Sequence, residues 1–213
     1  LVRYRKLLIE EEARRQRWER MREFSRKIRV NGYRFIAGID EAGRGPLAGP
    51  VVAAAVILDP EEPIYGLDDS KKLTGKKREE LYDIIMEKAL AVAVGIVNNK
   101  VIDRKNILQA TFQAMSEAVN KLSRTADYVL IDGNMEIPGL DIPQEAVIDG
   151  DQNVDAIAAA SIIAKVTRDR IMDKYHEFYP EYGFDRNKGY GTSEHIEALK
   201  KYASDIGYWP PES

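Results

Sequence analysis

The longest uninterrupted apolar stretch of the chain is the eight-residue segment Val51 to Leu58. It consists of valine, isoleucine, leucine and alanine, and Asp59-Pro60 ends it. A membrane-spanning helix needs about 20 apolar residues, so this segment is too short to cross a bilayer. A short β-branched run bounded by turn residues is typical of a strand that is buried on both faces. The segment therefore predicts an internal strand, beside a strand that we expect at Tyr33 to Asp40.

Strand and helix patterns alternate along the rest of the chain. We expect further strands at 91–97, 128–131 and 146–148, and helices at 76–90, 106–122, 156–176 and 194–202. Alanines crowd the start of the helix at 156–176, which allows that helix to approach a sheet closely. This pattern predicts an α/β domain in which helices pack over a central sheet.

The first part of the chain has a different charge from the rest. Residues 1–34 hold twelve Arg and Lys against five Glu, a net charge of +7, which leaves −10 for the remainder of a chain whose net charge is −3. Residues 3–29 lack Pro and Gly and predict a helix, with a thin apolar stripe at Trp18, Met21 and Ile28 that rests lightly on its surroundings. A basic arm indicates an anionic partner, and a solvated helix with internal ion pairs explains it equally well.

Asn31-Gly32 breaks the helical pattern, and we place a boundary there. The chain of 213 residues then divides into a basic helical extension at 1–32 and a domain at 33–213 that ends in helices. We expect residues 1–30 to be dispensable for chemistry and to strengthen binding to a polyanion. No basic-then-apolar secretion signal opens the sequence, so we expect a cytoplasmic protein without a membrane segment.

Composition excludes several kinds of site. The chain has no Cys, which excludes disulfides, thiol catalysis and cysteine-bound zinc, and its two His are too few for a histidine-built metal site. Carboxylates are the remaining candidates for metal ligands. Four of them, Asp40, Glu41, Asp132 and Asp151, lie where expected strands end or a helix begins.

Four clustered carboxylates without counter-charge repel one another, and divalent metal resolves that repulsion. Oxygen ligands favour Mg²⁺ or Mn²⁺, and two such ions about 4 Å apart activate a water and stabilise the leaving oxygen of a phosphodiester. Asp132 and Asp151 are each also explained as turn or cap residues. Taken together, the positions of the four acids favour a two-metal site in the cleft at the strand ends.

A glycine-rich turn, Gly43-Arg44-Gly45, follows the first acids. An apolar strand follows the turn where a dinucleotide fingerprint requires a helix, and no Walker loop is present. Two glycines leave the backbone bare, so that main-chain N–H groups can approach a sugar or phosphate closely. A simple turn between strands is the alternative interpretation.

Other candidate binding residues are basic, aromatic or hydroxylic. Lys71 and Lys72 precede a helix, where they bind phosphates or mark an exposed helix start. Tyr190 stands between glycines, which suits stacking on a sugar or base and equally suits a plain loop. Ser161 and Lys165 are four residues apart and share one helix face.

These segments together resemble the ribonuclease HII family of bacteria, over about residues 33 to 203. The matching segments are Gly38 to Val52, Asp69 to Leu73, Ile131 to Asn134, Gly150-Asp151, Ala158 to Asp169 and Lys188 to Thr192. The resemblance implies an RNase H-like fold, with a mixed central sheet flanked by helices, and a metal-dependent endoribonuclease. It implies that Asp40, Glu41, Asp132 and Asp151 are the catalytic and metal-binding carboxylates.

The resemblance also implies the substrate. The family cleaves the RNA strand of RNA–DNA hybrids and nicks 5′ of single ribonucleotides in duplex DNA, leaving 3′-hydroxyl and 5′-phosphate ends, as ribonucleotide excision repair requires. Gly43-Arg44-Gly45 is similar to the reader of the 2′-hydroxyl, and Tyr190 to the aromatic that stacks on the neighbouring sugar. We expect Lys71, Lys72, Ser161 and Lys165 to bind substrate, and the protein to act as a monomer.

The residues around the fourth acid both support the resemblance and depart from it. Asp151 favours ribonuclease HII over its sister family HIII, which carries Glu there. Asp149 and Gln152 to Asp155 differ from the usual family residues.

Two other functions compete with this interpretation. One is a non-catalytic nucleic-acid-binding module whose basic arm does the binding. The other is a nucleotide-dependent enzyme that uses the glycine turn. Metal-dependent cleavage of a duplex with one ribonucleotide discriminates among them.

Overall fold

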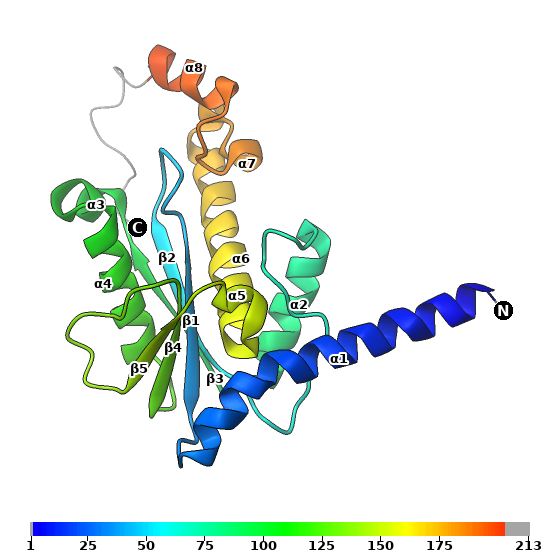
Figure 1. The fold of residues 1–213 in the computed structure, drawn as a ribbon. Helices are drawn as coiled ribbons and strands as arrows, with labels where there is room; N and C mark the ends of the chain where they lie inside the picture. The colour runs from blue at the N-terminus through cyan, green and yellow to red at the C-terminus, as the bar shows by residue number, and fades with distance from the viewer. Residues whose placement is uncertain (1, 203–213) are drawn as a thin grey trace.

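The computed structural model describes residues 2–202, which form a five-stranded sheet with helices on both faces (Figure 1). The strands are β1 (Ile36–Ala42), β2 (Val51–Ile57), β3 (Ala91–Val97), β4 (Tyr128–Asp132) and β5 (Gln144–Val147). The helices are α1 (Val2–Val30), α2 (Gly75–Lys88), α3 (Asn99–Lys105), α4 (Ile107–Asn120), α5 (Gly150–Asn153), α6 (Asp155–Phe178), the 3₁₀ turn η1 (Pro180–Tyr182), α7 (Phe184–Asn187) and α8 (Ser193–Tyr202).

The sheet is mixed, with strand order β3-β2-β1-β4-β5. β1 pairs antiparallel with β2 and parallel with β4, and β4 pairs parallel with β5. Every residue of β2 is buried, which confirms the internal strand predicted from its apolar sequence. β1 begins later than expected and continues through both of its acids, because its pairing with β2 extends as far as Ala42 opposite Val52.

The two faces of β2 belong to two hydrophobic cores. Val51, Ala53 and Ala55 pack in the cluster that contains the buried face of α4. Ala54 and Val56 pack in the cluster that contains α6 and α2. Successive side chains of a strand point to opposite faces, so an apolar run without polar interruption is what a sheet covered on both faces requires.

Close backbone approach sets the position of both main covering helices. A Cβ atom added to Gly38 of β1 would lie 2.1 Å from the backbone carbon of Ala156 in α6. A Cβ atom on Gly95 of β3 would lie 1.9 Å from the carbonyl oxygen of Ala114 in α4. Both glycines therefore leave room for a helix, and the alanine-rich start of α6 packs against the sheet as predicted.

Helix α1 has two halves with different surroundings. The side chains of residues 4–16 are exposed apart from that of Glu10, and this half extends away from the body (Figure 1). Trp18, Met21 and Ile28 are buried in the second half, where Met21 joins the core under α6 and α2. The apolar residues of this half are thus buried more completely than the light contact expected from their small number. The division of the chain at residue 32 stays a prediction.

The elements after α6 form a small cluster at one end of the molecule. Met172 from the end of α6 packs with Tyr182, Phe184 and Ala198, which come from η1, α7 and α8. The sequence patterns predict α4 and α8 but miss α3, α5, η1 and α7. These missed elements are too short to produce a helical periodicity. Within residues 2–202, no helix is both long and apolar enough to span a membrane.

Candidate active site

Three of the four predicted carboxylates meet at one edge of the sheet. Asp40 lies in β1, Asp132 ends β4, and Asp151 lies in α5. The parallel register pairs Ile39 with Ile131, so the acids that follow them are brought side by side. One carboxylate oxygen from each of Asp40, Asp132 and Asp151 lies within 4.8 Å of the other two.

Glu41 lies next to this group but is not one of the three acids whose oxygens approach within 4.8 Å of one another. It follows Asp40 on the same strand, and adjacent strand residues face opposite sides of the sheet. Its Oε1 atom is 3.2 Å from Nη1 of Arg44, to which it is paired. The structure therefore brings together Asp40, Asp132 and Asp151, and places Glu41 at the border of the group.

The electrostatics of the site favour a bound cation. Burial raises the pKa of Asp40 well above its usual range, and the charges of Glu41 and Asp132 raise it further. Burial likewise raises the pKa of Glu41 and that of Asp132. Burial, followed by the charges of Asp132 and Asp69, raises the pKa of Asp151 to about 6. A bound divalent cation would offset the cost of burying these like charges together. The set of oxygen ligands fits Mg²⁺ or Mn²⁺.

Hydrogen bonds hold the three acids in place. The main-chain N–H of Asp151 donates to Oδ1 of Asp132 over 3.1 Å, and that of Glu41 donates to Oδ1 of Asp40 over 2.7 Å. Ser161 is buried, and its hydroxyl bonds both to the Asp40 carboxyl and to the hydroxyl of Ser70, with 2.9 Å between the hydroxyl oxygens. Ser161 thus supports Asp40 and is covered from solvent.

The three lysines singled out in the sequence have different surroundings. Burial alone would lower the pKa of Lys71, but the charges of Asp69, Asp40 and the other site acids outweigh it and raise the pKa. The negative charge of the site therefore acts on Lys71. Lys72 donates from Nζ to Oε1 of Gln152 over 2.6 Å, beside Asp151 in α5. Lys165 pairs with Asp169 on its own helix at 2.7 Å.

The glycine turn and the Tyr190 loop lie against each other. The main-chain N–H groups of Leu47 and Ala48 both donate to the carbonyl of Gly189, over 2.8 and 3.3 Å. A Cβ atom on Gly45 would lie 3.8 Å from Cε1 of Tyr190, whose side chain is exposed. Lys165 places its Nζ atom 5.7 Å from the centre of the Tyr190 ring. Three segments far apart in sequence therefore present one surface.

Arg168 joins these two loops, and sequence reasoning gave it no role. Its side chain is 1% exposed. It donates to the carbonyls of Pro50, Ala48 and Lys188 over 3.0, 2.9 and 2.8 Å. A buried guanidinium is costly unless its N–H groups are satisfied, so these bonds fix both loops to α6. An Arg within a helix gives no sequence signal for such a role.

Asp69 is a second residue that the sequence analysis missed. It is buried, accepts from the main-chain N–H of Lys71 over 2.9 Å, and contributes to the raised pKa of Asp151. It brings a further acid to the site from the loop before α2. Its place in the family-like segment Asp69 to Leu73, next to the Lys71-Lys72 pair, is the sequence signal that could have identified it.

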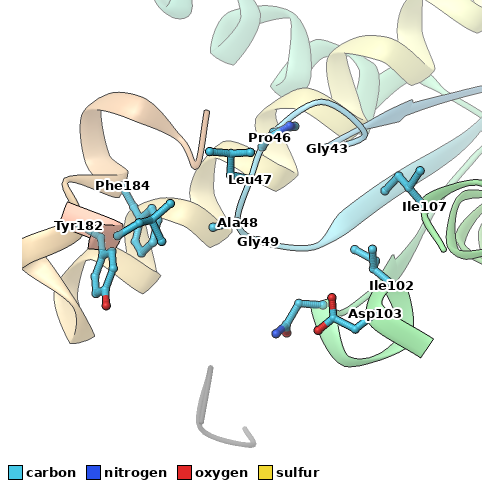
Figure 2. A pocket seen from close by; sticks show the side chains of 12 residues that line it. Gly43, Pro46, Leu47, Ala48, Gly49, Ile102, Asp103, Ile107, Tyr182 and Phe184 are labelled. Carbon is cyan, nitrogen blue, oxygen red and sulfur yellow. The ribbon is translucent and has the colours of Figure 1, made fainter. Parts of the chain in front are cut away.

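Beside the carboxylates, a hollow of about 270 Å³ opens between the glycine turn and the end of the molecule. Figure 2 shows Gly43 to Gly49 along one wall, with Ile102 and Ile107 on one side and Tyr182 and Phe184 on the other. None of the four predicted acids lines it. Apart from Asn99 and Asp103 its lining is glycine or apolar, and the grouped carboxylates of Asp40, Asp132 and Asp151 lie outside it, so we place the metal chemistry at the strand ends.

A mixed sheet covered by helices, with acids gathered at the ends of adjacent strands, defines an RNase H-like nuclease. The family described as Ribonuclease HII matches residues 37–211. The chain belongs to the ribonuclease HII family and is a ribonuclease H endoribonuclease.

Relatives and solved structures agree with this assignment. The chain is 56% identical over 192 residues to ribonuclease HII of Bacillus subtilis, covering 90% of this chain and 74% of that protein. It is 57% identical over 179 residues to ribonuclease HII of Endomicrobium trichonymphae, covering 84% and 85%. Ribonuclease H2 from Pyrococcus horikoshii has a TM-score of 0.71 and 28% identity, with 83% of this chain and 90% of that chain covered.

Proposed function

We propose that this enzyme incises the RNA strand of RNA–DNA hybrids and cuts on the 5′ side of single ribonucleotides in duplex DNA, leaving 3′-hydroxyl and 5′-phosphate ends. The observation that carries the proposal is the group of three carboxylates, Asp40, Asp132 and Asp151, within 4.8 Å of one another. The glycine turn follows Asp40 and Glu41 along the chain, and its exposed residue Gly45 lies near the exposed ring of Tyr190. Such a product supports a role in ribonucleotide excision repair.

Asp40, Asp132 and Asp151 would hold divalent metal, with Glu41 at the border of the same site. When bound, two Mg²⁺ or Mn²⁺ ions would lower the pKa of the attacking water and neutralise charge on the departing 3′ oxygen. The raised pKa values of these acids support this assignment, because buried, ionised carboxylates at such close range need a counter-charge.

The remaining residues bind and orient the substrate. Lys71, on which the charges of the site acids act, would hold the phosphate that is cut, and Lys72 and Lys165 would contact neighbouring phosphates after leaving their present partners Gln152 and Asp169. The backbone of Gly43 to Gly45 would contact the 2′-hydroxyl, the group that distinguishes RNA from DNA. Ser161 is proposed to act through Asp40, since its hydroxyl is buried against that acid.

Substitution of Asp132 tests the metal site. Asp132→Asn keeps the size of the side chain and removes the charge, so cleavage of a duplex with one ribonucleotide should fall by at least about a thousandfold in saturating Mg²⁺, equivalent to about 4 kcal/mol. Asp141→Asn is the matched control, because Asp141 is exposed in the loop before β5. Activity of Asp132→Asn within about tenfold of the parent would refute the assignment.

The substrate proposal needs its own comparison. The parent enzyme should cut a continuous hybrid and a duplex with one ribonucleotide, and leave an all-DNA duplex and a single-stranded RNA intact. End analysis of the product should show a free 3′-hydroxyl. Binding of the duplexes without any metal-dependent cutting would favour the non-catalytic module instead. The cytoplasmic location and the monomeric state also stay predictions.

A further inference from the structure

The inner half of α1 contacts the surroundings of Asp151, although α1 precedes the residues that match the family, 37–211. We propose that Arg17 and Ser25 of α1 are positioning residues that fix the Asp151 carboxylate for metal binding. The inference rests on the proposed function, because it takes Asp151 as a metal ligand. It assigns α1 a role distinct from any contact of its basic face with nucleic acid.

Arg17 anchors α1 to the loop before α2. Its Nη2 atom lies 2.6 Å from Oδ1 of Asp68, and its Nε donates to the carbonyl of Leu67 over 3.4 Å. The side chains of Arg17 and Asp68 are 34% and 24% exposed, so the pair is partly shielded from water. Trp18, the next residue of the helix, packs edge-on against Tyr65 of the same loop at 5.5 Å.

The contacts continue from this anchor to the neighbourhood of Asp151. The same Oδ1 atom of Asp68 accepts from the main-chain N–H of Asp69 over 2.8 Å. The Asp69 carboxyl in turn lies close enough to Asp151 to raise the pKa of that group. Arg17 therefore holds the acceptor that fixes the backbone of Asp69, a neighbour of the proposed metal ligand.

A second contact reaches α5, the four-residue helix that carries Asp151. Nη2 of Arg17 donates to the carbonyl of Gln152 over 3.4 Å. Lys72 binds the side chain of the same residue, as described above. A helix this short has little stability of its own, so its orientation depends on contacts of this kind.

The third contact lies just beyond α5. Ser25 and Asp155 are both buried, and the Ser25 hydroxyl donates to Oδ1 of Asp155 over 3.0 Å. Asp155 begins α6, and the N–H of Val154 donates to the carbonyl of Gly150 over 2.8 Å, which joins the two helices. The contacts of α1 thus lie at Gln152 and Asp155, on either side of the junction between α5 and α6.

Mn²⁺ binding to the full chain, measured by titration calorimetry without substrate, tests the inference. Arg17→Ala should weaken Mn²⁺ affinity by about tenfold, as is typical for residues that orient metal ligands. Arg20→Ala removes the same charge from the exposed side of α1 and should leave Mn²⁺ affinity unchanged. In cleavage assays, raising the Mn²⁺ concentration should restore kcat of Arg17→Ala, and KM for the duplex should not change.

Two further variants keep the test decisive. Ser25→Ala, which removes only the bond to Asp155, should weaken Mn²⁺ affinity severalfold even if Arg17→Ala proves too unstable to measure. Asp151→Asn separates the two ideas: Mn²⁺ affinity equal to the parent would refute the proposed metal site itself. Loss of Mn²⁺ affinity in Asp151→Asn, with parental affinity in both Arg17→Ala and Ser25→Ala, would overturn the positioning role alone.

Discussion

Arg168 in α6 donates from Nη2 to the carbonyl of Ala48 over 2.9 Å, so that a buried helix residue holds the glycine turn in place. The same guanidinium holds Lys188, two residues before Tyr190, over 2.8 Å. The two loops that we assign to substrate recognition are therefore fixed relative to each other by one buried side chain. Tight packing explains why Gly43 tolerates no side chain: a Cβ atom there would lie 2.5 Å from Nε of Arg168.

Replacement of Arg168 should harm both stability and substrate binding. Arg168→Gln leaves at least two buried carbonyls without a donor, which should lower the free energy of unfolding by about 3 kcal/mol. KM for the duplex should rise more than kcat falls, because the metal ligands lie on other elements. Urea denaturation and steady-state kinetics measure the two effects. Arg170→Gln, a partly exposed neighbour paired with Glu79, should cost less than about 1 kcal/mol.

Tyr190 should contribute through its ring. Tyr190→Ala should weaken productive binding by roughly tenfold to a hundredfold, since stacking on a base or sugar is worth about 1–3 kcal/mol. Tyr190→Phe keeps the ring and should behave nearly as the parent. The loss should be larger on a duplex with a single ribonucleotide than on a continuous hybrid, where many registers offer a site. Equal kcat/KM for Tyr190→Ala and parent on the single-ribonucleotide duplex would contradict this role.

Asp155 should make stability depend on pH. Burial raises the pKa of Asp155, although Ser25 and the charges of Arg29 and Arg22 partly oppose this. The folded state then binds the proton more tightly than the unfolded state, so this contribution to stability is complete below about pH 3.9 and is lost as pH rises through the folded pKa. Asp155→Asn keeps the acceptor for Ser25 but cannot ionise.

The free energy of unfolding of Asp155→Asn, relative to the parent, should therefore become more favourable as pH rises from 4 to 7. Urea denaturation at several pH values measures this difference. Asp155→Ala, which loses the acceptor, should be less stable than Asp155→Asn throughout. A difference between Asp155→Asn and parent that does not vary with pH would contradict the raised pKa.

The two halves of α1 should respond differently to truncation. Deletion of residues 1–16 removes an exposed helical segment with five basic and three acidic residues, so the fold should persist while duplex binding weakens and its salt dependence flattens. Deletion of residues 1–30 also removes the buried Trp18 and Met21, and should lower the melting temperature. Filter binding at several salt concentrations and thermal melts measure these effects. An unchanged salt slope after the shorter deletion would argue against a nucleic-acid role.

The sequence alone identified the features that depend on short stretches of neighbouring residues or on composition. The apolar run Val51 to Leu58 determined a central strand, because only a sheet covered on both faces accommodates consecutive apolar residues on alternating sides. The absence of Cys and the placing of acids at strand ends determined the type of ligand, and the ordered motifs determined the family.

Only the tertiary structure decided which of these residues meet. Parallel pairing of β1 with β4 brings Asp40 and Asp132 together, while strand alternation turns Glu41 toward Arg44. The roles of Arg168 and Arg17 depend on partners that are distant in sequence. Ala48 lies 120 positions from Arg168, and Asp68 lies 51 positions from Arg17. A single sequence does not show whether an arginine is buried or exposed, nor which distant groups it contacts. Only the fold determines both.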